Sequence, residues 1–346
     1  MSSEPVLKRG LSEEFLDALD ELAKGPSWWR DVLDHEDTRI AVRDGYLNVY
    51  CDGQSIFKVE FDRKTGTVRP SIHFKYLIRP SLADDDSGSG GEYVSLKGDD
   101  FDIGTRNLGH FIHTGYRAGT DGTLGDLIRT AKRFAGDEKK YVDDIVKRDP
   151  NVIDMEIAVQ NTNCRIDLAC IEPRKGAAAL VFYEVKLRAN RELNVPKSVP
   201  KNNHKLYLQA QNPADGEDNG DDERKERGIV VQMMKYDQML ADVDLNDVAK
   251  SYQKAAHDLR RLLARCEWRR AKLGRSINDV ADGTIALTVD PKVRLIITGF
   301  DGDQKSGKSF NTLLGGLNRL FEGRIYYRGT YGNDFATLAR TRPYPR

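Results

Sequence analysis

The chain has 346 residues, and its 54 Lys and Arg residues balance 54 Asp and Glu residues, so the formal net charge is zero. This balance excludes a polybasic, histone-like protein, although a nucleic-acid enzyme can carry a basic surface that is only local. No apolar run approaches the length of about 18 residues that indicates a membrane span. The N-terminus lacks an apolar signal-peptide core, and the four cysteines form no C-x-x-C pair. We therefore expect a cytoplasmic protein without membrane contact, disulfide framework or zinc knuckle.

The first part of the chain predicts a helix followed by an antiparallel meander. Apolar residues recur at helical spacing from Leu11 to Leu22, and Ser12 is placed to cap this helix. Strand-like runs then occupy residues 40–42, 46–51, 55–61 and 71–78. Asp-Gly pairs between the first three runs favour tight hairpin turns. We predict a module at 1–82 made of this helix and β-meander, followed by an acidic, glycine-rich linker at 83–92.

The remainder, residues 93–346, predicts a second domain of α/β class. A helical period runs over 124–146, and Asp149-Pro150 should end that helix. Three strands are predicted at 152–159, 165–171 and 179–187. Their short connections suit antiparallel neighbours. A long charged insertion at 188–228 is interpreted as a surface loop. Further helices are expected at 229–240, 246–273 and 309–321, and further strands at 293–299 and 324–327.

Charged residues inside the second and third of these strands form the candidate site. Asp167 lies in the second strand, and Glu184 and Lys186 lie in the third. Residues two apart in a strand share a face, so Glu184 and Lys186 point the same way. Charges in such apolar strands are costly unless something pairs with them. Two carboxylates and an ammonium at one point form a natural cation site, and the ammonium can also face a phosphate.

The pattern Asp-x16-Glu-x-Lys, in this strand context, resembles the PD-(D/E)xK nuclease superfamily. The restriction-endonuclease-like core of that superfamily runs helix, three-stranded meander, helix, strand, which matches the predicted order over residues 124–327. Gln232 and Tyr236 are similar to the Q-x-x-x-Y element of its RecB-like branch and share one helical face. The chain departs from the family in the 46 positions that separate Lys186 from Gln232 and in the absence of a proline before Asp167.

The resemblance implies a nuclease that uses Mg²⁺ or Mn²⁺ to hydrolyse phosphodiester bonds, of DNA rather than RNA, in repair, restriction or defence against foreign DNA. Asp167, Glu184 and the backbone carbonyl of Val185 would hold the metal through oxygen atoms. The metal would lower the pKa of a bound water and neutralise charge on the phosphate. Lys186 would orient the attacking water or stabilise the transition state.

The resemblance also implies supporting residues around this centre. Superfamily members often add an acidic residue from a preceding element, and Glu156, which shares a strand face with Asp154, is the first choice. Glu138 is the reserve, and each of the two is also interpretable as an ordinary salt-bridge partner. Gln232 and Tyr236 would position the substrate or the catalytic lysine. An activating protein partner or a homo-oligomer is compatible with this assignment.

Two other segments of the chain keep alternatives open. Gly302–Ser309 satisfies the G-x4-G-K-S pattern of a phosphate-binding loop, between a predicted strand and a predicted helix. Too few residues follow it to complete a nucleotide-binding domain, so an exposed loop is the preferred interpretation, with nucleotide binding through Lys308 as the alternative. The basic segment 260–275, with Trp268, fits a nucleic-acid grip and a solvated helix face equally well. A non-catalytic nucleic-acid-binding or partner-assembly module is the remaining alternative.

Overall fold

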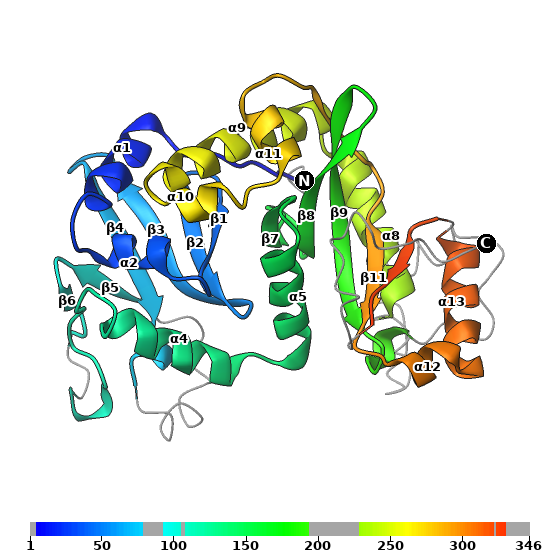
Figure 1. The fold of residues 1–346 in the computed structure, drawn as a ribbon, viewed down its shortest axis with the longest axis horizontal. Coiled ribbons are helices and arrows are strands. Elements are labelled where there is room, and N and C mark those ends of the chain that lie inside the picture. Colours follow the sequence, from blue (N-terminus) through cyan, green and yellow to red (C-terminus); the bar gives the residue numbers. More distant parts are fainter. Residues whose placement is uncertain (1–4, 79–92, 105–107, 194–227, 322, 330–346) are drawn as a thin grey trace. The chain divides into compact units, whose positions relative to one another are not determined.

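The computed structural model describes residues 5–78, 93–104, 108–193, 228–321 and 323–329 (Figure 1). These residues belong to two compact units. Unit 1 comprises Met1–Leu7, Ile145–Ala249 and Ala286–Arg346, and unit 2 comprises Lys8–Asp144 and Lys250–Ile285. Residues 93–144 therefore group with the N-terminal meander. The predicted linker at 83–92 lies outside the described residues, and so does the domain boundary predicted there.

Unit 2 contains an antiparallel sheet whose strands pair in chain order. The strands are β1 (Arg39–Val42), β2 (Tyr46–Cys51), β3 (Gln54–Asp62), β4 (Thr67–His73), β5 (Tyr93–Lys97) and β6 (Asp100–Phe101). Helix α1 (Glu13–Leu22) precedes the sheet, and the Ser12 hydroxyl caps it by accepting the Phe15 N–H at 3.3 Å. Asp52 and Gly53 both have positive φ, as the predicted hairpin requires. The predicted helix and meander are confirmed.

Unit 2 also contains further helices, two of which, α2 and α11, were not predicted from the sequence. They are α2 (Trp28–Asp34), α4 (Thr123–Phe134), α10 (Glu267–Arg270) and α11 (Arg275–Ala281). The helix predicted over 124–146 is interrupted at Ala135 and Gly136, after which α5 (Asp137–Arg148) begins. Glycine loses more backbone conformational entropy than any other residue when it enters a helix, which explains a break at this position. The helix predicted over 246–273 is likewise divided, because α9 (Leu245–Leu262) gives way to a 3₁₀ turn before α10.

Unit 1 contains a mixed sheet with the strand order β12-β11-β9-β8-β7. The strands are β7 (Val152–Ala158), β8 (Arg165–Arg174), β9 (Ala177–Leu187), β10 (Leu287–Val289), β11 (Arg294–Thr298) and β12 (Ile325–Tyr327). Strands β7, β8 and β9 form the predicted antiparallel meander, whereas β11 pairs in parallel with β9 and with β12. The short β10 pairs in parallel with the first part of β9. Strand β9 is therefore central, and its residues from Ala178 to Lys186 are all buried.

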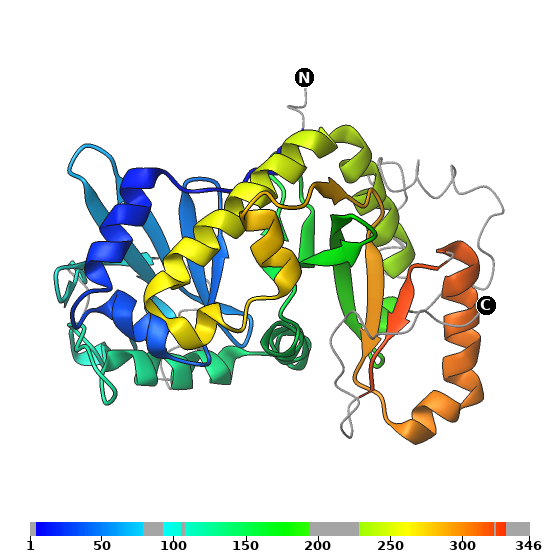
Figure 2. The same ribbon diagram turned by 45° about the horizontal axis from the view of Figure 1, so that its top comes forward.

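Among the described residues of unit 1, the meander is followed by α8 (Ile229–Asp242), the first residues of α9, α12 (Gly302–Ser306) and α13 (Lys308–Leu320). Helix α13 contacts β12, and Figures 1 and 2 both show the two lying next to each other. The fold is thus α/β, with one antiparallel and one mixed sheet. Most of the predicted insertion, residues 194–227, lies outside the described part of the chain. Within the described part no helix is long and apolar enough to cross a membrane.

Gly299 offers a test of how β11 ends. It follows the strand at φ 72°, and a Cβ atom there would lie 2.8 Å from Leu187 Cδ2. We expect Gly299→Ala to destabilise unit 1 by about 1–2 kcal/mol, because an L-residue pays for the left-handed conformation as well as the clash. Urea unfolding followed by circular dichroism measures this change in stability. Tryptophan fluorescence would report on the other unit, because the three tryptophans, Trp28, Trp29 and Trp268, all lie in unit 2.

Gly315 is the matched control for this substitution. It lies inside α13, where an added Cβ would have no atom within 4 Å apart from its chain neighbours and the adjacent backbone of the same helix. Gly315→Ala should therefore leave the unfolding midpoint unchanged or raise it, by up to about 1 kcal/mol in stability. Equal midpoints for the two alanine variants would contradict the close approach at Gly299.

Candidate active site

The start of β8 and the last residues of β9 bring Asp167 next to the Glu184–Lys186 pair. Leu168 pairs with Tyr183, so the antiparallel register places Asp167 level with Glu184. The half-buried Asp167 carboxylate accepts a hydrogen bond from the Val185 N–H, with 2.7 Å between N and Oδ2. This bond fixes one carboxylate between the two charged side chains of the neighbouring strand.

Glu184 and Lys186 lie on one face of β9, as the period of two predicted, and both are buried. Their exposed fractions are 2% and 6%. Lys186 Nζ lies 2.9 Å from Glu184 Oε1 and 3.3 Å from Glu192 Oε2. The ammonium is thus held between two carboxylates, one buried and one reached by solvent, since the Glu192 side chain is 39% exposed. Buried charges persist only with partners of this kind.

Helix α8 adds Gln232 and Tyr236 to the same point. Gln232 Nε2 donates to Glu184 Oε1 and to the Tyr236 hydroxyl oxygen, both at 2.7 Å. The Tyr236 hydroxyl in turn donates to the backbone carbonyl of Arg165. Burial, and then the charge of Glu184, raises the pKa of Tyr236, so the phenol stays a neutral donor. Two residues four apart on α8 therefore contact both strands, Gln232 through Glu184 in β9 and Tyr236 through Arg165 in β8.

Glu156 approaches from β7 with an unusual backbone conformation. Met155 pairs with Leu168 and Ile157 pairs with Ile166, so Glu156 lies level with Asp167. Its φ of 51° is left-handed, which costs a residue with a side chain about 1 kcal/mol or more. The Glu156 side chain is 12% exposed and its Oε2 lies 3.6 Å from Arg165 Nη1. Such strain next to a charged cluster is a common feature of functional sites.

The carboxylates at this point act on one another. Burial raises the pKa of Asp167 well above its usual range, and the charges of Glu184 and Glu156 raise it further. The Val185 N–H and the Lys186 ammonium oppose these effects without cancelling them. A divalent cation would relieve this repulsion, so the donor chemistry of the site fits the predicted Mg²⁺ or Mn²⁺.

A preformed metal cage is nevertheless absent from the described residues. No group of three or more His, Cys, Asp or Glu side chains there has the spacing to hold a metal ion. Glu184 Oε1 is engaged by both Lys186 and Gln232. Metal ligation by Asp167, Glu184 and the Val185 carbonyl stays a prediction. It requires the contact between Lys186 Nζ and Glu184 Oε1 to weaken, so that this oxygen can bind the metal.

Glu192, the second partner of Lys186, was not predicted from the sequence. This residue lies in a 3₁₀ turn, Arg191–Leu193, whose start is fixed by the Asn190 side chain accepting the Glu192 N–H at 3.0 Å. The turn opens the charged stretch that was interpreted as a surface loop. The Asn-x-Glu sequence is an Asx-turn signal, but nothing local indicates that the turn brings Glu192 back to Lys186. The reserve candidate Glu138 lies on α5, in the part of that helix that belongs to unit 2.

The Gly302–Ser309 segment forms two helices rather than a loop. Helix α12 is capped by Asp301, whose side chain accepts the Gln304 N–H at 2.7 Å, and Gly307 separates it from α13. The expected exposed loop is wrong, because a capping box stabilises a helical turn at this position. A phosphate-binding loop needs its backbone N–H groups turned toward one phosphate. Here the Lys305 and Gly307 N–H groups donate to backbone carbonyls.

The arginines of segment 260–275 are largely occupied within unit 2. Arg261 pairs with Glu13 and Asp17, and Arg265 pairs with Asp20, all three acids being on α1. The buried Arg269 donates to the carbonyl of Thr38 at 2.7 Å. These contacts favour a structural role for most of the basic segment, while Trp268 is left partly exposed.

The chain matches no family model, no curated protein and no solved structure in three separate comparisons.

Proposed function

We propose that unit 1 is a metal-dependent nuclease of the PD-(D/E)xK type that hydrolyses phosphodiester bonds in DNA, in repair, restriction or defence. The observation that carries the proposal is one connected cluster. Asp167, Glu184 and Lys186 from adjacent strands are linked to Gln232 and Tyr236 from the following helix by hydrogen bonds and an ion pair. A structural ion pair alone would not need five polar side chains from three elements.

The order of the elements supports the same proposal. Helix α5 precedes the β7–β9 meander, and α8 and the parallel strand β11 follow it. This is the helix, meander, helix, strand order of the restriction-endonuclease-like core. Strand β11 pairs with β9 alongside Glu184 and Lys186, since Leu295 and Ile297 are their register partners. Strand β9, which carries Glu184 and Lys186, therefore pairs with β11 on one side and with β8 on the other.

Each residue of the cluster has its own role in the proposed hydrolysis of phosphodiester bonds. Asp167 and Glu184, with Glu156 beside them, would hold Mg²⁺ or Mn²⁺, which supplies a water of lowered pKa and neutralises phosphate charge. The Lys186 ammonium faces the phosphate and stabilises the negative charge that develops as the P–O bond breaks. Gln232 holds the Glu184 carboxylate in place and is itself held by Tyr236.

The test is DNA cleavage by the full chain and by a Glu184→Gln variant. Wild type is incubated with single- and double-stranded DNA and with RNA, in Mg²⁺, Mn²⁺ or EDTA. We expect metal-dependent cutting of DNA that falls by at least about 10²-fold in Glu184→Gln, because the substitution removes a ligand charge but keeps a similar shape. Asp303→Asn, at an exposed position of the same unit, is the control and should cut like wild type. Cleavage of equal rate in Glu184→Gln would refute the proposed site.

A further inference from the structure

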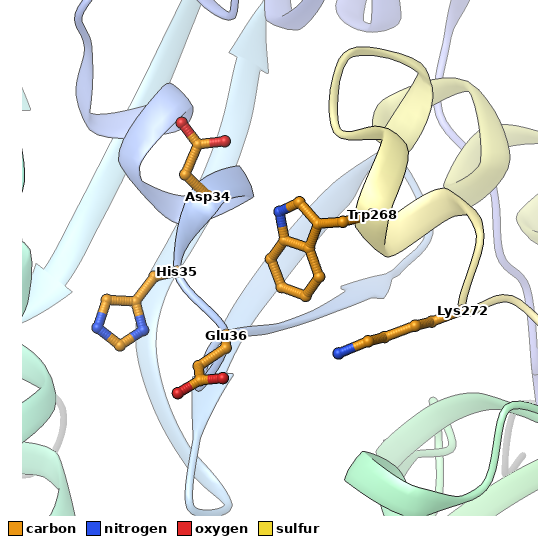
Figure 3. A pocket seen from close by; sticks show the side chains of 5 residues that line it. All are labelled: Asp34, His35, Glu36, Trp268 and Lys272. Carbon is orange, nitrogen blue, oxygen red and sulfur yellow. The ribbon is translucent and has the colours of Figure 1, made fainter.

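Unit 2 contains a solvent-open pocket of about 430 Å³ that the proposed chemistry does not use. Its lining residues are Asp34, His35, Glu36, Trp268 and Lys272 (Figure 3). The first three come from the end of α2 and the turn that follows it, and the other two come from α10 and the turn after α10. The pocket thus joins two segments that are far apart in the sequence.

Trp268 is the unusual member of this set. Its exposed fraction is 38%, whereas Trp28 and Trp29 are exposed by only 7% and 1%. The Arg269 guanidinium carbon lies 5.3 Å from the Trp268 ring centroid, and Lys272 Nζ lies 4.7 Å from it. Because Arg269 is buried and bonded to Thr38, the indole rests on an anchored cation. A large aromatic ring that is both fixed and exposed is suited to stacking.

The charges around the ring are of both signs. Figure 3 places Glu36 and Lys272 around the indole, with the two charged ends on the same side of the pocket. The described part of the chain gives neither of these two side chains an ion-pair partner. Asp34, by contrast, is bound by Arg30 through two hydrogen bonds of 2.6 and 2.8 Å. Burial lowers the pKa of His35, so its imidazole is neutral at pH 7.

We propose that this pocket binds one nucleotide of a single-stranded nucleic acid. The base stacks on Trp268, Lys272 meets the backbone phosphate, and the Glu36 carboxylate accepts N–H groups from the edge of the base. A cationic ligand fits less well, because the positive charges of Arg269 and Lys272 near the ring would repel it. The inference rests on the proposed nuclease function and gives it a substrate class, a strand whose bases are unpaired.

The free carboxylate also predicts which base is preferred. Guanine presents two adjacent N–H donors, N1–H and N2–H, on its pairing edge, and a carboxylate can accept both. Thymine presents a single N–H between two carbonyl oxygens, which a carboxylate repels. A strand with guanine in the pocket is therefore expected to bind more tightly than a strand of thymine alone.

Binding is measured in EDTA with the full-length Glu184→Gln protein, so that cleavage does not interfere. The probes are two labelled single-stranded oligonucleotides, one of thymine throughout and one with a central guanine, followed by fluorescence anisotropy. Trp268→Ala should weaken binding by about tenfold or more, and Trp268→Phe should retain most of it. Lys272→Gln should weaken binding of both probes. Tyr93→Ala, which removes a ring that is 45% exposed elsewhere in unit 2, is the matched control and should bind normally.

Glu36→Gln tests the base preference separately, since it should reduce the ratio of the two affinities toward one. Unchanged binding in Trp268→Ala would overturn the inference, as would a free guanosine monophosphate that binds as tightly as the strand. The cleavage assay keeps the two proposals apart. Metal-dependent cutting with no effect of Trp268→Ala on binding would remove this inference alone, whereas Trp268-dependent binding without any cutting would remove the nuclease proposal alone.

Discussion

Replacing Lys186 with glutamine is expected to lower the rate of metal-dependent DNA cleavage by about 10²–10³-fold, the usual effect of removing one donor that stabilises transition-state charge. The amide can still donate to Glu184, so the buried carboxylate keeps a partner while the positive charge is lost. Single-turnover cleavage with saturating DNA is the measurement, because it separates the chemical step from binding. A rate within tenfold of wild type would show that the ammonium has no part in the reaction.

Glu192→Gln is the matched control for this prediction. It removes the second carboxylate next to Lys186 and leaves the 2.9 Å contact between Lys186 and Glu184. The Glu192 side chain is 39% exposed, so its charge is partly screened by water. We expect a smaller loss, of no more than about tenfold. A loss as large as that of Lys186→Gln would instead place Glu192 among the groups that touch the metal or the phosphate.

The residues of the candidate site could be predicted because their relation is local. Glu184 and Lys186 are two apart in a strand, and Gln232 and Tyr236 are four apart in a helix, so short periods fix which side chains share a face. The contact between these two pairs is not local, and it rested on the resemblance alone. The structure brings them together through the 2.7 Å bond from Gln232 to Glu184.

Other features depended on packing that no local pattern reveals. Glu156 has a left-handed φ inside the continuous strand β7, at a sequence, Met155-Glu156-Ile157, that predicts an ordinary strand. Glu192 reaches Lys186 only because a 3₁₀ turn reverses the chain after β9. Gly302–Ser309 shows the reverse case. The G-x4-G-K-S pattern of a phosphate-binding loop is complete in the sequence, but the backbone forms helices there instead of that loop.

Asp167 is where stability and the proposed function conflict. Burial and the neighbouring carboxylates raise its pKa in the folded protein, so the folded state binds this proton more tightly than the unfolded state does. Stability is therefore lost as the pH rises from the ordinary pKa of an aspartate to the raised value, and the loss persists at neutral pH. Each unit of the shift corresponds to about 1.4 kcal/mol.

Asp167→Asn should consequently make the metal-free protein more stable while it abolishes cleavage. The asparagine oxygen can still accept the Val185 N–H, and the repulsion from Glu184 and Glu156 disappears. We expect the midpoint of thermal unfolding in EDTA at pH 7 to rise by several degrees, with the difference from wild type shrinking as the pH is lowered. Asp303→Asn, at an exposed position, should shift neither stability nor cleavage.

Magnesium should reverse the order of the two proteins. A cation that binds the folded wild type stabilises it by mass action, whereas Asp167→Asn has lost a charged ligand and should respond weakly. Circular dichroism melts at increasing Mg²⁺ concentration measure this without any nucleic acid. A variant that is less stable than wild type in EDTA would show that Asp167 is held by structural contacts rather than strained by its neighbours. If the wild-type protein melts at the same temperature with and without the metal, the strained carboxylates are not a cation site.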